Sequence, residues 1–75
     1  MERYKNIDGD SGVAGYESGA DFIRVQFSDG AVYLYTYASA GSQAIEQMKA
    51  QAAAGRGLNA FINTTVKKSY ARKER

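Results

Sequence analysis

The chain has 75 residues with 44% apolar and 24% charged side chains and a net charge of +2, an ordinary globular composition that suits one small domain. It contains no cysteine and no histidine, which excludes disulfides and thiolate metal sites and removes the commonest general base. No apolar run approaches the ~20 residues of a membrane helix, and no signal-peptide segment begins the chain, so we expect a cytoplasmic protein without membrane, metal or cofactor.

The first part of the chain is polar, and we expect residues 1–10 to be a flexible lead-in to a single domain spanning residues 1–75. Asp8 and Asp10 alternate beside glycine, as at the start of a calcium-binding loop. That loop needs an oxygen ligand where Gly12 stands and a Glu where Gly19 stands. A turn is therefore the preferred interpretation of this stretch.

Three stretches then show the residue pattern of β-strands. They cover residues 12–17, 20–28 and 31–37, with glycine-containing turn signals between them. In the second stretch, Ile23, Val25 and Phe27 point to one face and the polar residues between them point to the other. We expect an antiparallel sheet of about three strands, because a lone hairpin is only marginally stable in water.

The hairpin between the last two strands has two registers, which differ in the length of the loop. A two-residue loop at Asp29 and Gly30 faces Val32 and Leu34 toward the core. A three-residue loop, residues 28–30, with its glycine in the left-handed region, faces the tyrosines of the third strand toward the core instead. The register matters for function, because tyrosines on the open face beside an arginine would form a platform for stacking bases.

The segment SQAIEQMKAQAAA, residues 42–54, contains good helix formers and neither proline nor β-branched crowding. Ser39 or Ser42 is the expected N-cap, and Gly55 is the expected end. The predicted apolar stripe consists of Ala44, Ile45, Met48 and Ala52. This pattern predicts a helix laid on the sheet.

A second, shorter helix is predicted after Gly57, with an apolar stripe of Leu58, Phe61, Ile62 and Val66. Thr64, Thr65 and Val66 are poor helix formers, so a closing strand over residues 63–70 stays open as the alternative. The sequence therefore predicts an α+β fold of the order β-β-β-α-α, in which one or two C-terminal helices cover one face of the sheet.

Charge is distributed unevenly along the chain. Residues 1–46 carry seven acidic and three basic side chains, whereas residues 47–75 carry seven basic side chains and one acid. An anionic partner would therefore bind the C-terminal part. The candidate binding residues are Lys49, Arg56, Lys67, Lys68, Arg72 and Lys73, with Tyr70 as a stacking ring.

Two segments within this basic part have a functional and a plain interpretation. Arg56 stands between two glycines before a helix, which suits a phosphate-binding loop and equally suits an ordinary interhelical turn. The basic tail, residues 67–75, is either a solvated terminus or an arm for nucleic acid. A functional role requires Arg56, Lys49 and the tail bases to lie on one surface, and we expect such a continuous positive surface.

Several residues together resemble the KTSC domain, a family of about 60 residues found in bacterial and phage proteins and at the C-terminus of some lysyl-tRNA synthetases. The resemblance covers roughly residues 12–70 and is carried by Tyr16-Glu17, Ile23-x-Val25-x-Phe27-x-x-Gly30-x-x-Tyr33-x-Tyr35, Gly57-Leu58-Asn59, Phe61-Ile62-Asn63 and Tyr70. Leu34 departs from the family pattern, which has a charged or polar residue there. The resemblance implies that Tyr33 and Tyr35 are structural and face the core, so we favour the three-residue loop.

These features favour a binding module over an enzyme. The chain has no Ser-x-x-Lys motif and no pair of carboxylates on neighbouring elements, so we expect no enzymatic activity. The KTSC family has no established activity, and the synthetase fusion suggests RNA binding. The leading hypothesis is weak binding of RNA or single-stranded nucleic acid through the basic C-terminal third. The competing hypothesis is a protein-interaction or homodimerisation module that uses the sheet edge or the open face.

Overall fold

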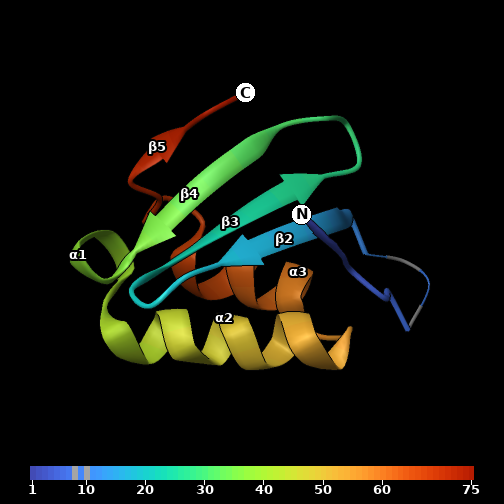
Figure 1. Ribbon diagram of the computed structural model, residues 1–75, viewed down its shortest axis with the longest axis horizontal. Helices are drawn as coiled ribbons and strands as arrows, with labels where there is room; N and C mark the ends of the chain where they lie inside the picture. Colours follow the sequence, from blue (N-terminus) through green and yellow to red (C-terminus); the bar gives the residue numbers. More distant parts are fainter. Residues whose placement is uncertain (8, 10) are drawn as a thin grey trace.

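Five antiparallel strands lie side by side in the order β1-β2-β3-β4-β5 (Figure 1) in a computed structural model, which describes residues 1–7, 9 and 11–75. The strands are β1 (Glu2–Arg3), β2 (Val13–Ser18), β3 (Phe22–Phe27), β4 (Val32–Thr36) and β5 (Arg72–Lys73). The predicted α+β class is confirmed. The sheet has more strands than the predicted three, because each end of the chain adds a two-residue strand to one edge.

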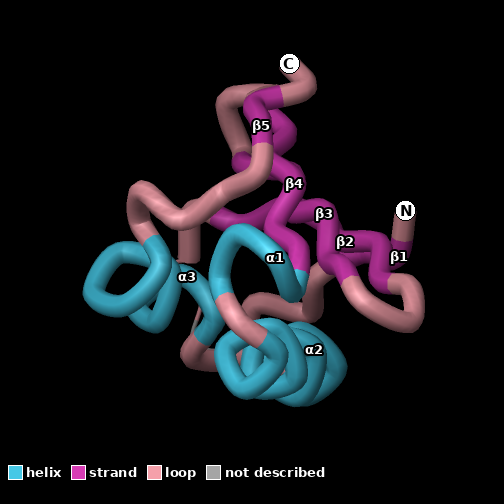
Figure 2. Tube along the Cα trace, turned by 90° about the vertical axis from the view of Figure 1, so that its left-hand side faces the viewer, coloured by secondary structure: helices cyan, strands magenta, loops and turns pink. Residues whose placement is uncertain are grey.

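The helices all lie on one side of the sheet (Figure 2). They are α1 (Tyr37–Ala40), α2 (Ser42–Ala54), α3 (Leu58–Phe61) and the π-helical turn η1 (Ile62–Val66). The bounds of α2 are those predicted, and α3 with η1 occupies the predicted second helix. The alternative closing strand over residues 63–70 does not form, because the chain stays helical to Val66 and pairs with β4 only from Ala71 onward.

The caps at the start of the helices differ from the predicted ones. Helix α2 begins after Gly41, whose φ is 91°, without a side-chain cap. Ser39 instead belongs to α1, where Thr36 Oγ1 accepts the Ser39 N–H at 3.1 Å and Ser39 Oγ accepts the Thr36 N–H at 3.0 Å. This capping box gives the chain a separate short turn of helix between the sheet and α2. Gly55 ends α2 in the left-handed conformation, as predicted.

The hairpin between β3 and β4 has the three-residue loop. The Phe27 N–H donates to Ala31 O at 2.8 Å, and Gly30 has a φ of 92°, which costs a glycine little. Strand pairing then sets Val25 opposite Tyr33 and Ile23 opposite Tyr35. The favoured register is confirmed: the ring of Tyr35 is only 1% exposed and that of Tyr33 is half-buried.

The hydrophobic core lies between the helix-facing side of the sheet and the two predicted helical stripes. Its fully buried members are Tyr4, Val13, Ile23, Val25, Tyr35, Ile45, Met48, Ala52, Leu58, Ile62 and Val66. Val32 is also buried but lies outside this cluster. It pairs with Gln26 on the other face of the sheet, where Glu74 and Arg75 pair with its backbone.

The predicted flexible lead-in is wrong for the part that the structure describes. Strand β1 pairs with β2, and Tyr4 is 3% exposed within the core. The Tyr4 N–H donates to Ala14 O at 3.0 Å, and the Ile7 N–H donates to Gly55 O at 2.8 Å. One aromatic ring in a polar segment leaves no periodic pattern, so the sequence carried no sign of this docking. Asp8 and Asp10, on which the calcium-loop interpretation depended, lie outside the described residues.

The basic tail is not a loose terminus. The Ala71 N–H donates to Leu34 O at 2.6 Å and the Glu74 N–H donates to Val32 O at 2.7 Å. These bonds attach β5 to the outer edge of β4. A two-residue strand has too little alternation to be recognised from sequence alone.

The burial of Tyr35 leads to a stability prediction. We expect Tyr35→Ala to lower the free energy of unfolding by about 3–5 kcal/mol, which is close to all that a domain of this size has. Leu34 is half-buried on the opposite face of the sheet, so Leu34→Ala is the control and should cost clearly less. Urea denaturation followed by circular dichroism measures both. Equal losses for the two variants would contradict the observed register.

The same residue leads to a pH prediction. Burial, together with the neighbouring Tyr33 and Tyr70, raises the pKa of Tyr35 to about 12 from its ordinary 10.0. The unfolded chain therefore loses this proton at a lower pH than the folded chain. We expect the ionisation of Tyr35 to leave the free energy of unfolding unchanged below about pH 10. As the pH rises from about 10 to 12, that free energy should fall. Comparing wild type with Tyr35→Phe by denaturation and by tyrosinate absorbance tests this, and identical pH profiles would contradict it.

Candidate functional site

A cleft of about 560 Å³ opens between the end of the sheet, η1 and the segment that leads to β5. Its lining includes three lysines and three tyrosines, namely Lys67, Lys68, Lys73, Tyr33, Tyr35 and Tyr70. Figure 2 shows how the chain leaves the helical layer and rises past the sheet to β5. The cleft therefore exists because the tail returns to the sheet.

The aromatic rings of the cleft support one another edge-on. The ring centroids of Tyr33 and Tyr70 are 4.8 Å apart at an interplanar angle of 68°, and those of Tyr35 and Tyr70 are 6.4 Å apart at 89°. Phe27 contacts Tyr33 in the same way at 5.7 Å. Tyr70 is nevertheless 39% exposed. An exposed ring held by buried rings is a surface on which a base can stack.

The cations of the cleft come from two places in the chain. Lys67 and Lys68 are exposed in the turn that follows η1, where positive charge suits the negative end of a helix. Lys73 comes from β5, and its Nζ lies 5.8 Å from the centroid of the Tyr33 ring. Asp29 is the acidic residue of the lining, and its Oδ1 accepts the Ala31 N–H at 3.0 Å. The cleft therefore offers three positive charges around an aromatic wall.

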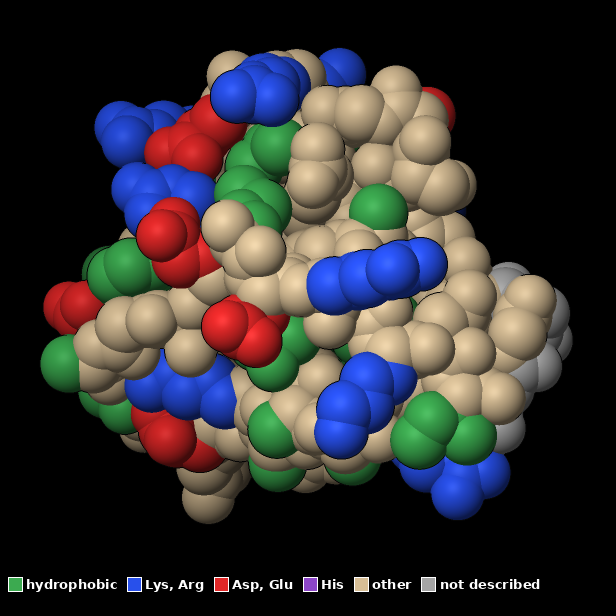
Figure 3. Space-filling model, turned by 45° about the vertical axis from the view of Figure 1, so that its right-hand side comes forward, with side chains coloured by type: hydrophobic (Ala, Val, Ile, Leu, Met, Phe, Trp, Pro, Cys, Tyr) green, Lys and Arg blue, Asp and Glu red, His purple; other side chains and the backbone are tan. Residues whose placement is uncertain are grey.

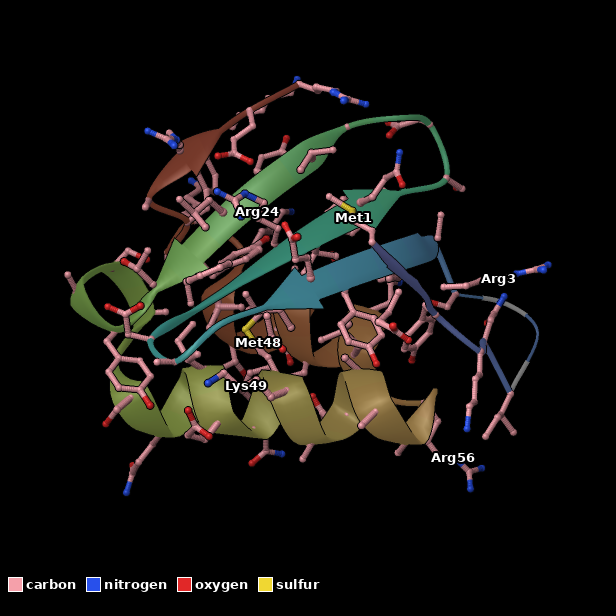
Figure 4. All side chains as sticks on the ribbon, viewed as in Figure 1. Met1, Arg3, Arg24, Met48, Lys49 and Arg56 are labelled. Atoms are coloured by element: carbon pink, nitrogen blue, oxygen red, sulfur yellow. The ribbon has the colours of Figure 1, made fainter. Side chains whose placement is uncertain are left out.

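Lys49 lies in a different environment. Its Nζ donates to Glu46 Oε2 at 2.9 Å and to Ala20 O at 3.0 Å, in the turn between β2 and β3 (Figure 4). Tyr37 also donates its hydroxyl to Glu46 at 2.6 Å. The hydrogen bonds from Lys49 and Tyr37 hold the pKa of Glu46 below its ordinary value. Lys49 is therefore paired with an acid and is not part of the cleft.

Arg56 is also separated from the cleft. It lines a second hollow of about 200 Å³, together with Tyr4, Asn59 and neighbouring residues. Among the described residues, this hollow shares no lining residue with the cleft. Figure 4 shows its side chain beyond the end of α2, pointing away from the sheet. Residues 55–57 form the turn that joins α2 to α3.

Arg72 lies on the open face of the sheet. Its Nη2 is 3.1 Å from Glu74 Oε2, and Glu74 Oε1 is 2.8 Å from Arg24 Nε. Arg24 also pairs with Glu17 at 3.0 Å. The space-filling view shows acidic and basic side chains interleaved on one side of the molecule (Figure 3). The open face around Arg72 is therefore not an uninterrupted positive surface.

The expected continuous surface through Lys49, Arg56 and the tail is thus corrected. Four of the predicted binding residues come together in the cleft, namely Lys67, Lys68, Tyr70 and Lys73, and the other three are elsewhere. Tyr33, which the sequence assigned to structure alone, and Asn63 were not predicted to line the cleft. The alternation of β5 separates Arg72 from Lys73, and no sequence signal for that strand was strong enough to show it.

In the part of the chain that the structure describes, no helix is long and apolar enough to cross a membrane, and no group of three or more acidic side chains is placed to hold a metal ion. Comparison of the chain with protein-family models, with curated proteins and with solved structures found no match. The resemblance to KTSC domains therefore stays a prediction.

The aromatic contacts of Tyr70 generate a prediction about how firmly the cleft wall is held. We expect Tyr70→Ala to lower the free energy of unfolding by about 1–3 kcal/mol, because it removes two edge-on ring contacts worth about 0.5–1.5 kcal/mol each. Tyr70→Phe keeps the ring and should leave the stability nearly unchanged. Chemical denaturation measures both variants. A Tyr70→Ala variant as stable as wild type would mean that this ring is not anchored in solution.

Proposed function

We propose that this protein is a small, non-enzymatic, cytoplasmic KTSC-like module that binds RNA or another single-stranded nucleic acid weakly in the cleft of Lys67, Lys68 and Lys73. The observation that carries the proposal is that three lysines and the exposed ring of Tyr70 line the same cleft. Lysines neutralise backbone phosphates, and an aromatic ring accepts a base of any sequence. This combination is typical of proteins that bind single strands without reading their sequence.

The size of the cleft supports a short, weak contact. A volume of about 560 Å³ falls within the usual ~300–1,000 Å³ range of small-molecule sites. Such a site holds a few nucleotides at most. Three phosphate contacts on a single strand predict that log K falls with log salt at a slope of about −2. Binding should therefore be measurable at low salt and weak at physiological salt.

The sheet edges and the open face, which the competing hypothesis uses, are less suited to binding a partner than the cleft is. The two edge strands of the sheet, β1 and β5, are each two residues long. Very short edge strands are poor templates for pairing with another chain. On the open face, Arg24 is paired with Glu17 and Glu74. A protein partner or homodimer at the edge or face is accordingly the competing outcome of the binding experiment.

We predict that the double variant Lys67→Gln with Lys68→Gln binds a labelled 12-nucleotide mixed-sequence RNA at least about tenfold more weakly at low salt, with a salt slope reduced by about 1.4. The matched control is Lys49→Gln with Arg56→Gln, which removes the same charge outside the cleft. Its affinity should change by less than about threefold. Fluorescence anisotropy at several salt concentrations measures both.

Two results would reject the proposal. The first is an unchanged NMR spectrum of the wild-type protein on adding the RNA at low salt. The second is an equal loss of affinity in the two double variants, which would show that only net charge matters. Concentration-dependent self-association that does not respond to salt would instead support the protein-interaction alternative.

A further inference from the structure

Two of the side chains that form the cleft wall, Tyr70 and Lys73, belong to the last segment of the chain. That segment is attached to the sheet by the two-residue strand β5. A strand of only two residues opens easily, because few backbone hydrogen bonds hold it. The placement of Tyr70 and Lys73 therefore needs a further anchor.

The alternation of β5 distributes its side chains over the two faces of the sheet. Lys73 pairs with Tyr33, whose ring lies beneath its ammonium group in the cleft. Arg72 pairs with Leu34, which also pairs with Arg24 on the open face. Glu74 follows on the open side, with its N–H bonded to Val32 O at 2.7 Å. The side chains of Lys73 and Glu74 thus lie on opposite faces of the sheet.

The anchor is the carboxylate of Glu74. Its Oε1 accepts the Arg24 Nε–H at 2.8 Å, and its Oε2 accepts the Arg72 Nε–H at 3.2 Å. Glu74 and Arg24 are partly shielded from water, with side chains 21% and 29% exposed. Burial by itself would raise the pKa of Glu74, but the hydrogen bonds from Arg24 and Arg72 hold that pKa below its ordinary value. The carboxylate is therefore ionised at neutral pH, as a charge-assisted hydrogen bond requires.

We propose that Glu74 and Arg24 are positioning residues for the cleft: their ion pair on the open face fixes β5 against β4, so that Lys73 and Tyr70 are held ready for a nucleic-acid ligand. This inference rests on the proposed function. A wall that is ordered before binding removes the cost of ordering Lys73 and Tyr70 when the ligand arrives. Glu74 thus favours the binding of an anion although it is itself an anion.

The sign of a single substitution separates this role from simple electrostatics. Glu74→Gln makes the protein one charge more positive near the site. If Glu74 acts only through its charge, RNA binding becomes tighter. If Glu74 positions the wall, binding becomes weaker, because the amide cannot form an ion pair with Arg24. The two explanations therefore predict opposite changes in affinity.

The experiment compares wild type, Glu74→Gln and the control Glu2→Gln, which removes an acidic charge from the opposite edge strand, β1. Affinity for the labelled 12-nucleotide RNA is measured at low salt, and NMR reports the ring signals of Tyr33 and Tyr70 and the exchange of the Ala71 and Glu74 amides. We expect Glu74→Gln to bind at least about threefold more weakly, with shifted ring signals and faster amide exchange. Glu2→Gln should bind as tightly as wild type or slightly more tightly.

A double-substitution cycle adds a test of the pair itself. In the variant with both Arg24→Gln and Glu74→Gln, the loss of affinity should be smaller than the sum of the two single losses, because both remove the same contact. Additive losses would show that the two residues act separately and would overturn the pairing.

Tighter binding by Glu74→Gln, with unchanged ring signals and amide exchange, would overturn the inference. Failure of the proposed function has a different signature, namely a wild-type protein that does not bind the RNA at all. In that case the ring signals and the exchange of the Ala71 and Glu74 amides still decide whether Glu74 positions the wall. Unchanged signals would reject that role, and shifted signals with faster exchange would support it.

Discussion

The three-residue loop between β3 and β4 sets which side chains of β4 face the helices. Because Gly30 adopts a positive φ and Phe27 pairs with Ala31, Tyr33 and Tyr35 turn toward the helices. A one-residue change in register would move both rings to the open face. The ring of Tyr35 then could not join the core, and Tyr33 could not form the floor beneath the tail.

That register also determines which side chains of the tail lie in the cleft. The outer edge of β4 accepts β5, and pairing across an antiparallel ladder puts Lys73 on the same side as Tyr33. The cleft thus lies mainly between two segments distant in sequence, residues 27–35 and residues 62–73, which meet where β5 pairs with β4. The ion pair between Glu74 and Arg24 lies on the other side of the same ladder, so one short strand couples the open face to the cleft.

The basic charge of the C-terminal part is distributed by this geometry into distinct roles. Lys49 and Arg72 lie beside Glu46 and Glu74, respectively, and exposed pairs of this kind contribute little to stability. Lys67, Lys68 and Lys73 gather around an aromatic wall. Net charge alone would treat these five side chains as equivalent, whereas their neighbours make only three of them members of the cleft.

The α+β class, the extent of α2, both apolar helical stripes and the three central strands were predictable from sequence, because each leaves a periodic pattern or a glycine signal in the local sequence. The sequence also identified Lys67, Lys68, Tyr70 and Lys73 as candidates. Which basic side chains come together was visible only in the folded chain, because that depends on pairing between distant segments. The fold likewise revealed β1 and β5, since strands of two residues are too short for alternation to be detected and form only where a neighbouring edge accepts their backbone hydrogen bonds.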